Sequence, residues 1–158
     1  MNLRLVGLAV TLAGAVALAG CGGDEGGPQP PGPDPFFPAD FLTTYTQVRD
    51  CRFSVEHDLH SIQVYINPEA AKAYTDSIYP FAAGTICVKP EYTDPQCSQI
   101  AAYAVMRKGP PGTAPDGGDW EWQIVGADLK VVRSAQTEGC VDCHALCTNG
   151  RDFTCTDP

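Results

Sequence analysis

The sequence predicts an α+β fold, in which a mainly antiparallel β-sheet packs with a few short helices ahead of a distinct C-terminal segment. Two observations lead to this prediction. Short runs in which every second residue is apolar recur from about Thr43 onward, and no long apolar stripe with helical spacing accompanies them. The chain of 158 residues is also long enough for one domain but not for two. We place this domain at residues 43–158.

The expected strands follow one another at short intervals. In the first of them Ile62, Val64 and Ile66 fall on one face, as the period of two requires. A short helix is expected over residues 68–74, with Asn67 as N-cap and a proline at the first helical position. The expected strands cover residues 61–67, 85–89, 100–106, 120–125 and 129–132.

The N-terminus has the pattern of a lipoprotein signal peptide over residues 1–20. A short basic start precedes an apolar run, and the tetrapeptide Leu-Ala-Gly-Cys that ends at Cys21 resembles the lipobox of bacterial lipoproteins. An ordinary signal peptide with a cysteine at this place by chance is the alternative. We therefore expect an exported, periplasmic or outer-membrane-attached protein that is held at the membrane by a lipid anchor on Cys21. Residues 21–42 are rich in Gly and Pro and are expected to form a disordered tether.

The charge of the chain argues against a nucleic-acid partner. Its formal net charge is −9, and only 10 of its residues are Lys or Arg. Binding to phosphates requires clustered basic side chains. We therefore expect no nucleic acid among its partners.

The segment Cys140-Val-Asp-Cys-His144 carries the strongest chemical signal. Two thiols three positions apart lie on one face of a helical turn and can bond to the two vinyl groups of one porphyrin. His144 follows directly and can bind the iron as its proximal ligand. We expect one haem c per chain, bound covalently by Cys140 and Cys143. A closed zinc site that adds Cys147, or a disulfide between Cys140 and Cys143, are the alternatives.

The remaining cysteines are expected to form disulfides, because an exported protein meets oxidising conditions. With Cys21 assigned to lipid and two cysteines to haem, five of the eight are left, so at least one lacks a partner within the chain. The closest pairs are Cys87 with Cys97 and Cys147 with Cys155, and short loops cost little entropy to close. Other pairings stay open.

Several further segments occur in a characteristic order. Together with the late haem motif they resemble the cytochrome P-460 family, which includes the β-sheet cytochromes called c′-beta. The resemblance runs from about Cys51 to Asp157. The segments are Val64–Asn67 with the helix to Tyr74, Pro80–Lys89, Met106–Lys108, Gly118–Trp122 and Asp152–Thr154.

The resemblance implies an antiparallel sheet packed on helices, often a homodimer, and an iron with an open sixth position that binds a small-molecule ligand or substrate. In the P-460 branch a lysine after the Gly-Thr-x-x-Val strand bonds to a meso carbon of the haem, and the enzyme oxidises hydroxylamine with nitric oxide chemistry at the iron. The matching position is Lys89. From the residues alone, Lys89 is instead a solvated lysine at a strand end, before a turn at Pro90.

The resemblance therefore favours an oxidoreductase for small nitrogen species, which passes electrons to a redox partner protein. The alternatives are a non-catalytic gas-binding cytochrome and a mono-haem electron carrier in which Met106 or His60 closes the sixth position. The parity of Met106 with its apolar neighbours favours a core residue. His57 and His60 are candidates for metal binding or proton transfer. Trp120 and Trp122 share a face and are expected to pack against haem or core.

Overall fold

The computed structural model describes residues 32–135, 138–147 and 150–156. The predicted signal peptide, Cys21 and the first part of the predicted tether lie outside these residues. Within the part of the chain that is described, no helix is long and apolar enough to cross a membrane.

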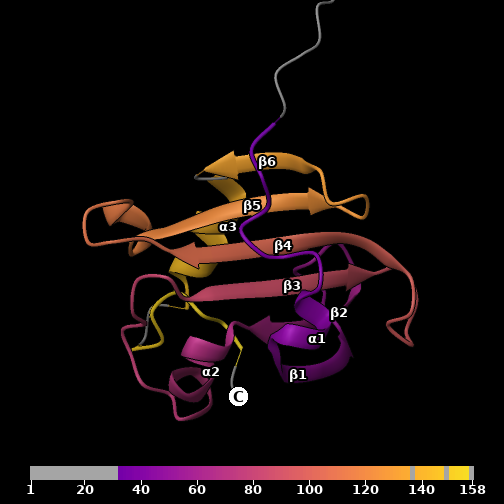
Figure 1. Ribbon diagram of the computed structural model, residues 1–158, viewed down its shortest axis with the longest axis horizontal. Helices are drawn as coiled ribbons and strands as arrows, with labels where there is room; N and C mark the ends of the chain where they lie inside the picture. Colours follow the sequence, from indigo (N-terminus) through magenta and orange to yellow (C-terminus); the bar gives the residue numbers. More distant parts are fainter. Residues whose placement is uncertain (1–31, 136–137, 148–149, 157–158) are drawn as a thin grey trace, which may run out of the picture. The chain divides into compact units, whose positions relative to one another are not determined.

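Over the described residues, a single antiparallel sheet of six strands organises the domain, and the order of the strands in the sheet is their order in the chain (Figure 1). The predicted α+β class is confirmed. The strands are β1 (Thr46–Phe53), β2 (Ser61–Ile66), β3 (Ile86–Tyr92), β4 (Ile100–Lys108), β5 (Trp120–Gly126) and β6 (Val131–Ala135). The helices are α1 (Phe41–Thr44), α2 (Pro68–Thr75) and α3 (Glu138–Ala145), with a 3-10 turn η1 at Pro115–Gly117.

The sheet buries both of its faces, which we name by what covers them. The α3 face carries the side chains that pack against α2, α3 and the C-terminal segment, and the N-terminal face is covered by residues 36–45 (Figure 1). Because neighbouring residues of a strand point to opposite faces, Val64 belongs to the α3 face and Tyr65 to the N-terminal face. The core therefore consists of two clusters, one on each side.

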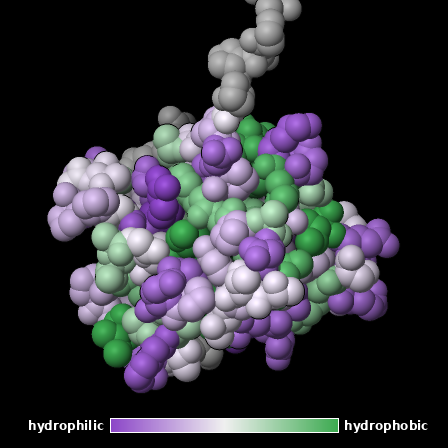
Figure 2. Space-filling view, in the orientation of Figure 1, coloured by the Kyte–Doolittle hydropathy of each residue, from purple (hydrophilic) through white to green (hydrophobic). Residues whose placement is uncertain are grey.

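The predicted tether is too long at its C-terminal end. Phe37 and Phe41 are 5% and 1% exposed and pack on the N-terminal face. The Phe41 ring lies edge-on to Tyr65 and Tyr103, and the Phe37 ring is tilted against Tyr103. Burying a phenylalanine side chain contributes about 1.5–3 kcal/mol, which opposes the entropy cost of ordering this Pro-rich segment. Figure 2 shows this side of the molecule, where hydrophobic and hydrophilic residues are interspersed around the N-terminal segment.

Strand β3 does not end at the turn that was expected at Pro90. It continues to Tyr92, and the Pro90 side chain is fully buried. A proline in an inner strand cannot donate a ladder hydrogen bond, and the Cα pairing of β3 with β2 skips from Glu91 to Val88. The extra length brings Glu91 onto the same face as Lys89, which matters for the site described below.

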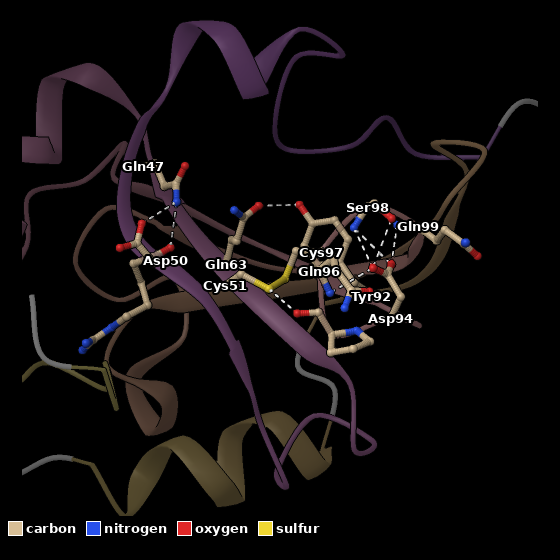
Figure 3. Close-up of a disulfide and its surroundings, with 12 residues drawn as sticks. Gln47, Asp50, Cys51, Gln63, Tyr92, Asp94, Gln96, Cys97, Ser98 and Gln99 are labelled. Carbon is tan, nitrogen blue, oxygen red and sulfur yellow. Dashed lines mark hydrogen bonds between the residues drawn. A yellow bond between two sulfur atoms is a disulfide. The ribbon is translucent and has the colours of Figure 1, made fainter.

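One of the two predicted disulfides is wrong. Cys51 of β1 bonds to Cys97 in the turn between β3 and β4, where Asp94 accepts several backbone hydrogen bonds (Figure 3). Cys87 lies at the start of β3, five residues from the strand's other end and thus roughly 17 Å from this turn. It is a buried free thiol. The predicted pair Cys147–Cys155 is confirmed.

Asn67 occupies the predicted N-cap position of α2, but its side chain makes no capping hydrogen bond. The amide instead accepts from the Ile86 N–H at 2.8 Å and donates to the Gly84 carbonyl at 3.1 Å. Asn67 therefore fastens the start of α2 to the start of β3.

Candidate functional site

Helix α3 presents the predicted attachment motif on the α3 face. Cys140 and Cys143 are both free thiols, separated by one turn of the helix, so that their side chains lie on one side of it. Cys140 packs against the core cluster, whereas Cys143 is exposed. The disulfide alternative for this pair is therefore wrong. The zinc alternative loses its fourth ligand, because Cys147 is bonded to Cys155.

The ring of His144 is held by a backbone carbonyl. Its Nδ1–H donates to the Phe153 carbonyl oxygen at 2.6 Å, and the ring lies edge-on to Trp122 with centroids 6.3 Å apart. Burial lowers the pKa of His144 to about 4, although the hydrogen bond to Phe153 acts in the opposite direction. The imidazole is therefore neutral at pH 7. With the proton on Nδ1, the lone pair of Nε2 is left for a metal ion.

The Phe153 carbonyl owes its position to Asp152. One oxygen of this carboxylate accepts from Lys108 Nζ at 2.6 Å, and the other accepts from the Phe81 N–H at 2.8 Å. The Asp152 carbonyl in turn accepts from Trp120 Nε1 at 2.8 Å. The side chains of Lys108 and Asp152 are each 9% exposed. This buried network ties the C-terminal segment to the sheet beside the histidine.

A small cavity of about 30 Å³ lies between the sheet and α3. Two neighbouring, more open pockets of about 450 and 300 Å³ share His57 and His144 with it, and their volumes reach the range of ligand-binding pockets. Trp122 Nε1 is buried and has no hydrogen-bond partner among the described residues, so a donor is left without an acceptor at the wall of the cavity. The side chains that matter for its chemistry are Cys87, Lys89, Met106, Trp122, Cys140 and His144.

Lys89 is buried at this cavity, so the expectation of a solvated strand-end lysine is wrong. Its Nζ lies 2.9 Å from His57 Nε2, and His57 Nδ1 lies 2.8 Å from Glu91 Oε1. Burial lowers the pKa of Lys89, and the nearby Arg52 lowers it further, against the opposite effects of Cys87 and Glu91. A neutral amine is thereby favoured at the cavity wall.

The comparisons with known proteins agree with this geometry. The model of one family, cytochrome P460, matches residues 40–156, which is most of the chain. The chain belongs to the cytochrome P460 family. This membership identifies it as a haem-binding cytochrome and confirms the resemblance drawn from the sequence. No curated protein matches the chain.

The residues of this cytochrome P460 family member fit a haem. The cavity walls are largely apolar, two free thiols stand one helical turn apart at its edge, and a neutral imidazole with an available Nε2 lies beside them. No group of three metal-ligating side chains occurs among the described residues, which leaves no support for His57 and His60 as a separate metal site. Met106 packs in the core cluster and also lines the cavity. Trp120 and Trp122 both pack in that cluster, as expected.

Sequence reasoning missed two residues of the site. Glu91 was hidden by the expected turn at Pro90, because only a strand that continues past the proline places its carboxylate beside Lys89. Asp152 belonged to a segment that marked the family resemblance, but no pattern in the sequence indicated its partner Lys108. An Asp and a Lys at a distance of 44 residues carry no recognisable spacing.

Proposed function

We propose that the chain binds one haem c, with thioether bonds from Cys140 and Cys143 and with His144 as the proximal iron ligand. The observation that carries this proposal is the hydrogen bond from His144 Nδ1 to the Phe153 carbonyl, which leaves Nε2 as the free nitrogen beside a largely apolar cavity. Iron supplies a site for a small ligand and a route for electrons. A hydrogen bond to the other ring nitrogen orients a ligating histidine and raises its basicity.

The reaction that this site supports best is the oxidation of a small nitrogen compound, hydroxylamine or nitric oxide, at an open sixth position. Each hydrogen removed from hydroxylamine on the way to nitric oxide leaves as one proton and one electron. The electrons pass to a redox partner protein. Trp122 Nε1, which has no hydrogen-bond partner in the described part of the chain, can donate a hydrogen bond to an oxygen atom in the cavity.

Lys89 is the residue we propose to bond to a haem carbon. Its burial at the same cavity as Cys140 and His144 supports this role. The bond replaces one N–H and one C–H bond and releases two electrons, so it requires a two-electron oxidant of the peroxide class, which leaves as water. A bond of this kind distorts the macrocycle and so tunes the iron.

An electron carrier is the second candidate, because Met106 lines the cavity that His144 faces. In that case its thioether sulfur closes the sixth position, and substitution by leucine opens it. A gas-binding cytochrome without catalysis has the same open iron as the enzyme, and it differs in releasing no electrons from hydroxylamine.

We also propose that the protein is exported and anchored through an acylated Cys21, and that it can form a homodimer. The anchor rests on the sequence pattern, since Cys21 lies outside the described residues, and the homodimer rests on the resemblance to the cytochrome P-460 family. Mass analysis of the mature N-terminus tests the anchor: a diacylglycerol on Cys21 supports it, and an unmodified Cys21 contradicts it.

Absorption spectra and an assay of hydroxylamine oxidation together distinguish the candidate functions. The enzyme proposal expects a five-coordinate haem, a spectral change when nitric oxide or hydroxylamine is added, and reduction of an artificial electron acceptor by hydroxylamine. A six-coordinate spectrum that becomes five-coordinate in Met106→Leu would instead establish the electron carrier. If nitric oxide changes the spectrum but hydroxylamine does not reduce the electron acceptor, the protein is a gas-binding cytochrome.

A further inference from the structure

Two buried side chains, Lys89 and Glu91, and the half-buried His57 form a hydrogen-bonded chain that ends at the haem cavity. Lys89 Nζ lies 2.9 Å from His57 Nε2, and His57 Nδ1 lies 2.8 Å from Glu91 Oε1. Lys89 and Glu91 are two residues apart on β3 and therefore point to the same face, whereas His57 comes from the loop before β2. Lys89 and Glu91 are 9% and 8% exposed, so the chain is shielded from most of the solvent.

The groups at the two ends of this hydrogen-bonded series, Glu91 and Lys89, determine which nitrogen of His57 carries the proton. A carboxylate can only accept hydrogen bonds, so Glu91 requires the proton of the neutral imidazole to be on Nδ1. His57 Nε2 then carries a lone pair, and the amine of Lys89 donates to it. Among the described residues, His57 is the one hydrogen-bonding partner of that amine. A nucleophile, a base and a carboxylate that orients the base thus follow one another, as in catalytic triads.

The loop that carries His57 holds it in place. Asp58 and Leu59 both have positive φ, at 50° and 61°, a conformation that aspartate tolerates but that is uncommon for leucine. The turn is closed by the His60 N–H, which donates to the His57 carbonyl at 2.8 Å, and by the Ser54 N–H, which donates to the His60 carbonyl at 2.9 Å. The imidazole therefore does not depend on its two side-chain hydrogen bonds alone.

We propose that His57, oriented by Glu91, is the proton acceptor that makes the Lys89 amine a nucleophile at the haem cavity. This inference rests on the proposed function, in which Lys89 bonds to a haem carbon. As the bond forms, Nζ becomes positively charged and must lose a proton, which His57 Nε2 accepts. The carbon loses the second proton, and the two electrons go to the peroxide-class oxidant, which leaves as water. His57 acts through Lys89 and is a positioning and proton-accepting residue.

Other ionisable groups surround the amine and enter its pH dependence. Arg52 opposes protonation of Lys89, whereas Cys87, Glu91 and Cys143 favour it when they are ionised. His144 faces the same cavity from α3. None of these groups is hydrogen-bonded to the Lys89 amine among the described residues, whereas His57 Nε2 lies 2.9 Å from it. In the proposal, His57 is therefore the group that accepts the proton directly.

The test compares full-length, haem-loaded wild type with His57→Gln and with the control His60→Gln. His60 belongs to the same loop, but its Nδ1 lies 3.8 Å from Glu91 Oε2, beyond hydrogen-bond distance. Each protein is treated with hydrogen peroxide, and peptide mass spectrometry measures the fraction of haem peptide joined to Lys89. A general base contributes on the order of 10²–10⁴-fold, so His57→Gln should link at least tenfold more slowly and His60→Gln at the wild-type rate. Linking by His57→Gln should recover at high pH, where hydroxide replaces the base.

Two results would overturn the inference and leave the proposed function intact. One is an equal linking rate in wild type and His57→Gln, and the other is a slower rate in His57→Gln that high pH does not restore. If haem is bound but wild type forms no link, the proposed role of Lys89 fails. Acetic anhydride labelling of the unlinked Lys89 then decides the inference: at least tenfold slower labelling in His57→Gln supports it, and equal labelling refutes it.

Discussion

Removal of the Asp152 carboxylate should destabilise the protein far more than removal of an exposed carboxylate. In Asp152→Ala the Lys108 ammonium keeps, among the described residues, only the Gly118 carbonyl as hydrogen-bond acceptor, and the Phe81 N–H loses the Asp152 carboxylate. Breaking a buried ion pair in this way costs about 3–5 kcal/mol, because an uncompensated charge stays buried. The control Asp76→Ala also removes the carboxylate of a Lys–Asp pair, but that pair is exposed, and its loss should cost under about 1 kcal/mol.

Urea denaturation followed by far-ultraviolet circular dichroism measures both free energies of unfolding. Asp152 has a φ of 49°, which asparagine also tolerates, so Asp152→Asn separates the charge from the backbone conformation. We expect Asp152→Asn to lose less stability than Asp152→Ala, because the amide oxygen can still accept one hydrogen bond. If Asp152→Ala lowers the free energy of unfolding by no more than Asp76→Ala does, the buried network does not hold the C-terminal segment. It then cannot be what positions the Phe153 carbonyl beside His144.

Three further predictions concern neighbouring residues. Gly118 has a φ of +62°, and an added Cβ would lie 2.5 Å from the Phe153 ring, so Gly118→Ala should lower the free energy of unfolding by roughly 1–3 kcal/mol; an unchanged urea midpoint would contradict this. Burial raises the pKa of the Cys87 thiol to about 11, so iodoacetamide at pH 8 should alkylate it only after unfolding, and rapid native labelling would refute this. Burial lowers the pKa of Lys89, whereas a neighbouring carboxylate raises the pKa of the exposed Lys130. Acetylation of an unlinked Lys89 should therefore reach half its maximal rate at a lower pH than acetylation of Lys130. The reverse order would show that Lys89 is not desolvated.

Strands of the sheet could be predicted where apolar and polar residues alternate along the sequence. Strand β2 was recognised because its apolar residues recur with period two, and α2 because a proline stands at its first position. Strand β1 was not predicted, because most of its side chains are exposed and it lies at the edge of the sheet, paired only with β2. Such a strand is specified by its ladder hydrogen bonds, which leave no mark on the side-chain pattern.

The site shows the same division. The attachment motif Cys140–His144 could be recognised because its chemistry requires neighbouring residues in a fixed spacing. The acceptor for His144 is a backbone carbonyl, and any residue at position 153 supplies one, so the sequence carries no signal for it. The pairing of His57 with Lys89 joins a loop to a strand 32 residues away. Only the folded sheet brings such residues together.

Mass spectrometry of the purified mature protein determines whether haem is bound covalently and where. We expect one covalent haem per chain, recovered on the proteolytic peptide that contains Cys140 and Cys143, with the Lys89 peptide joined to it. Haem on that peptide without Lys89 would refute the cross-link and still support a c-type cytochrome. If iodoacetamide alkylates both Cys140 and Cys143 and neither carries haem, the proposal of a c-type cytochrome is refuted.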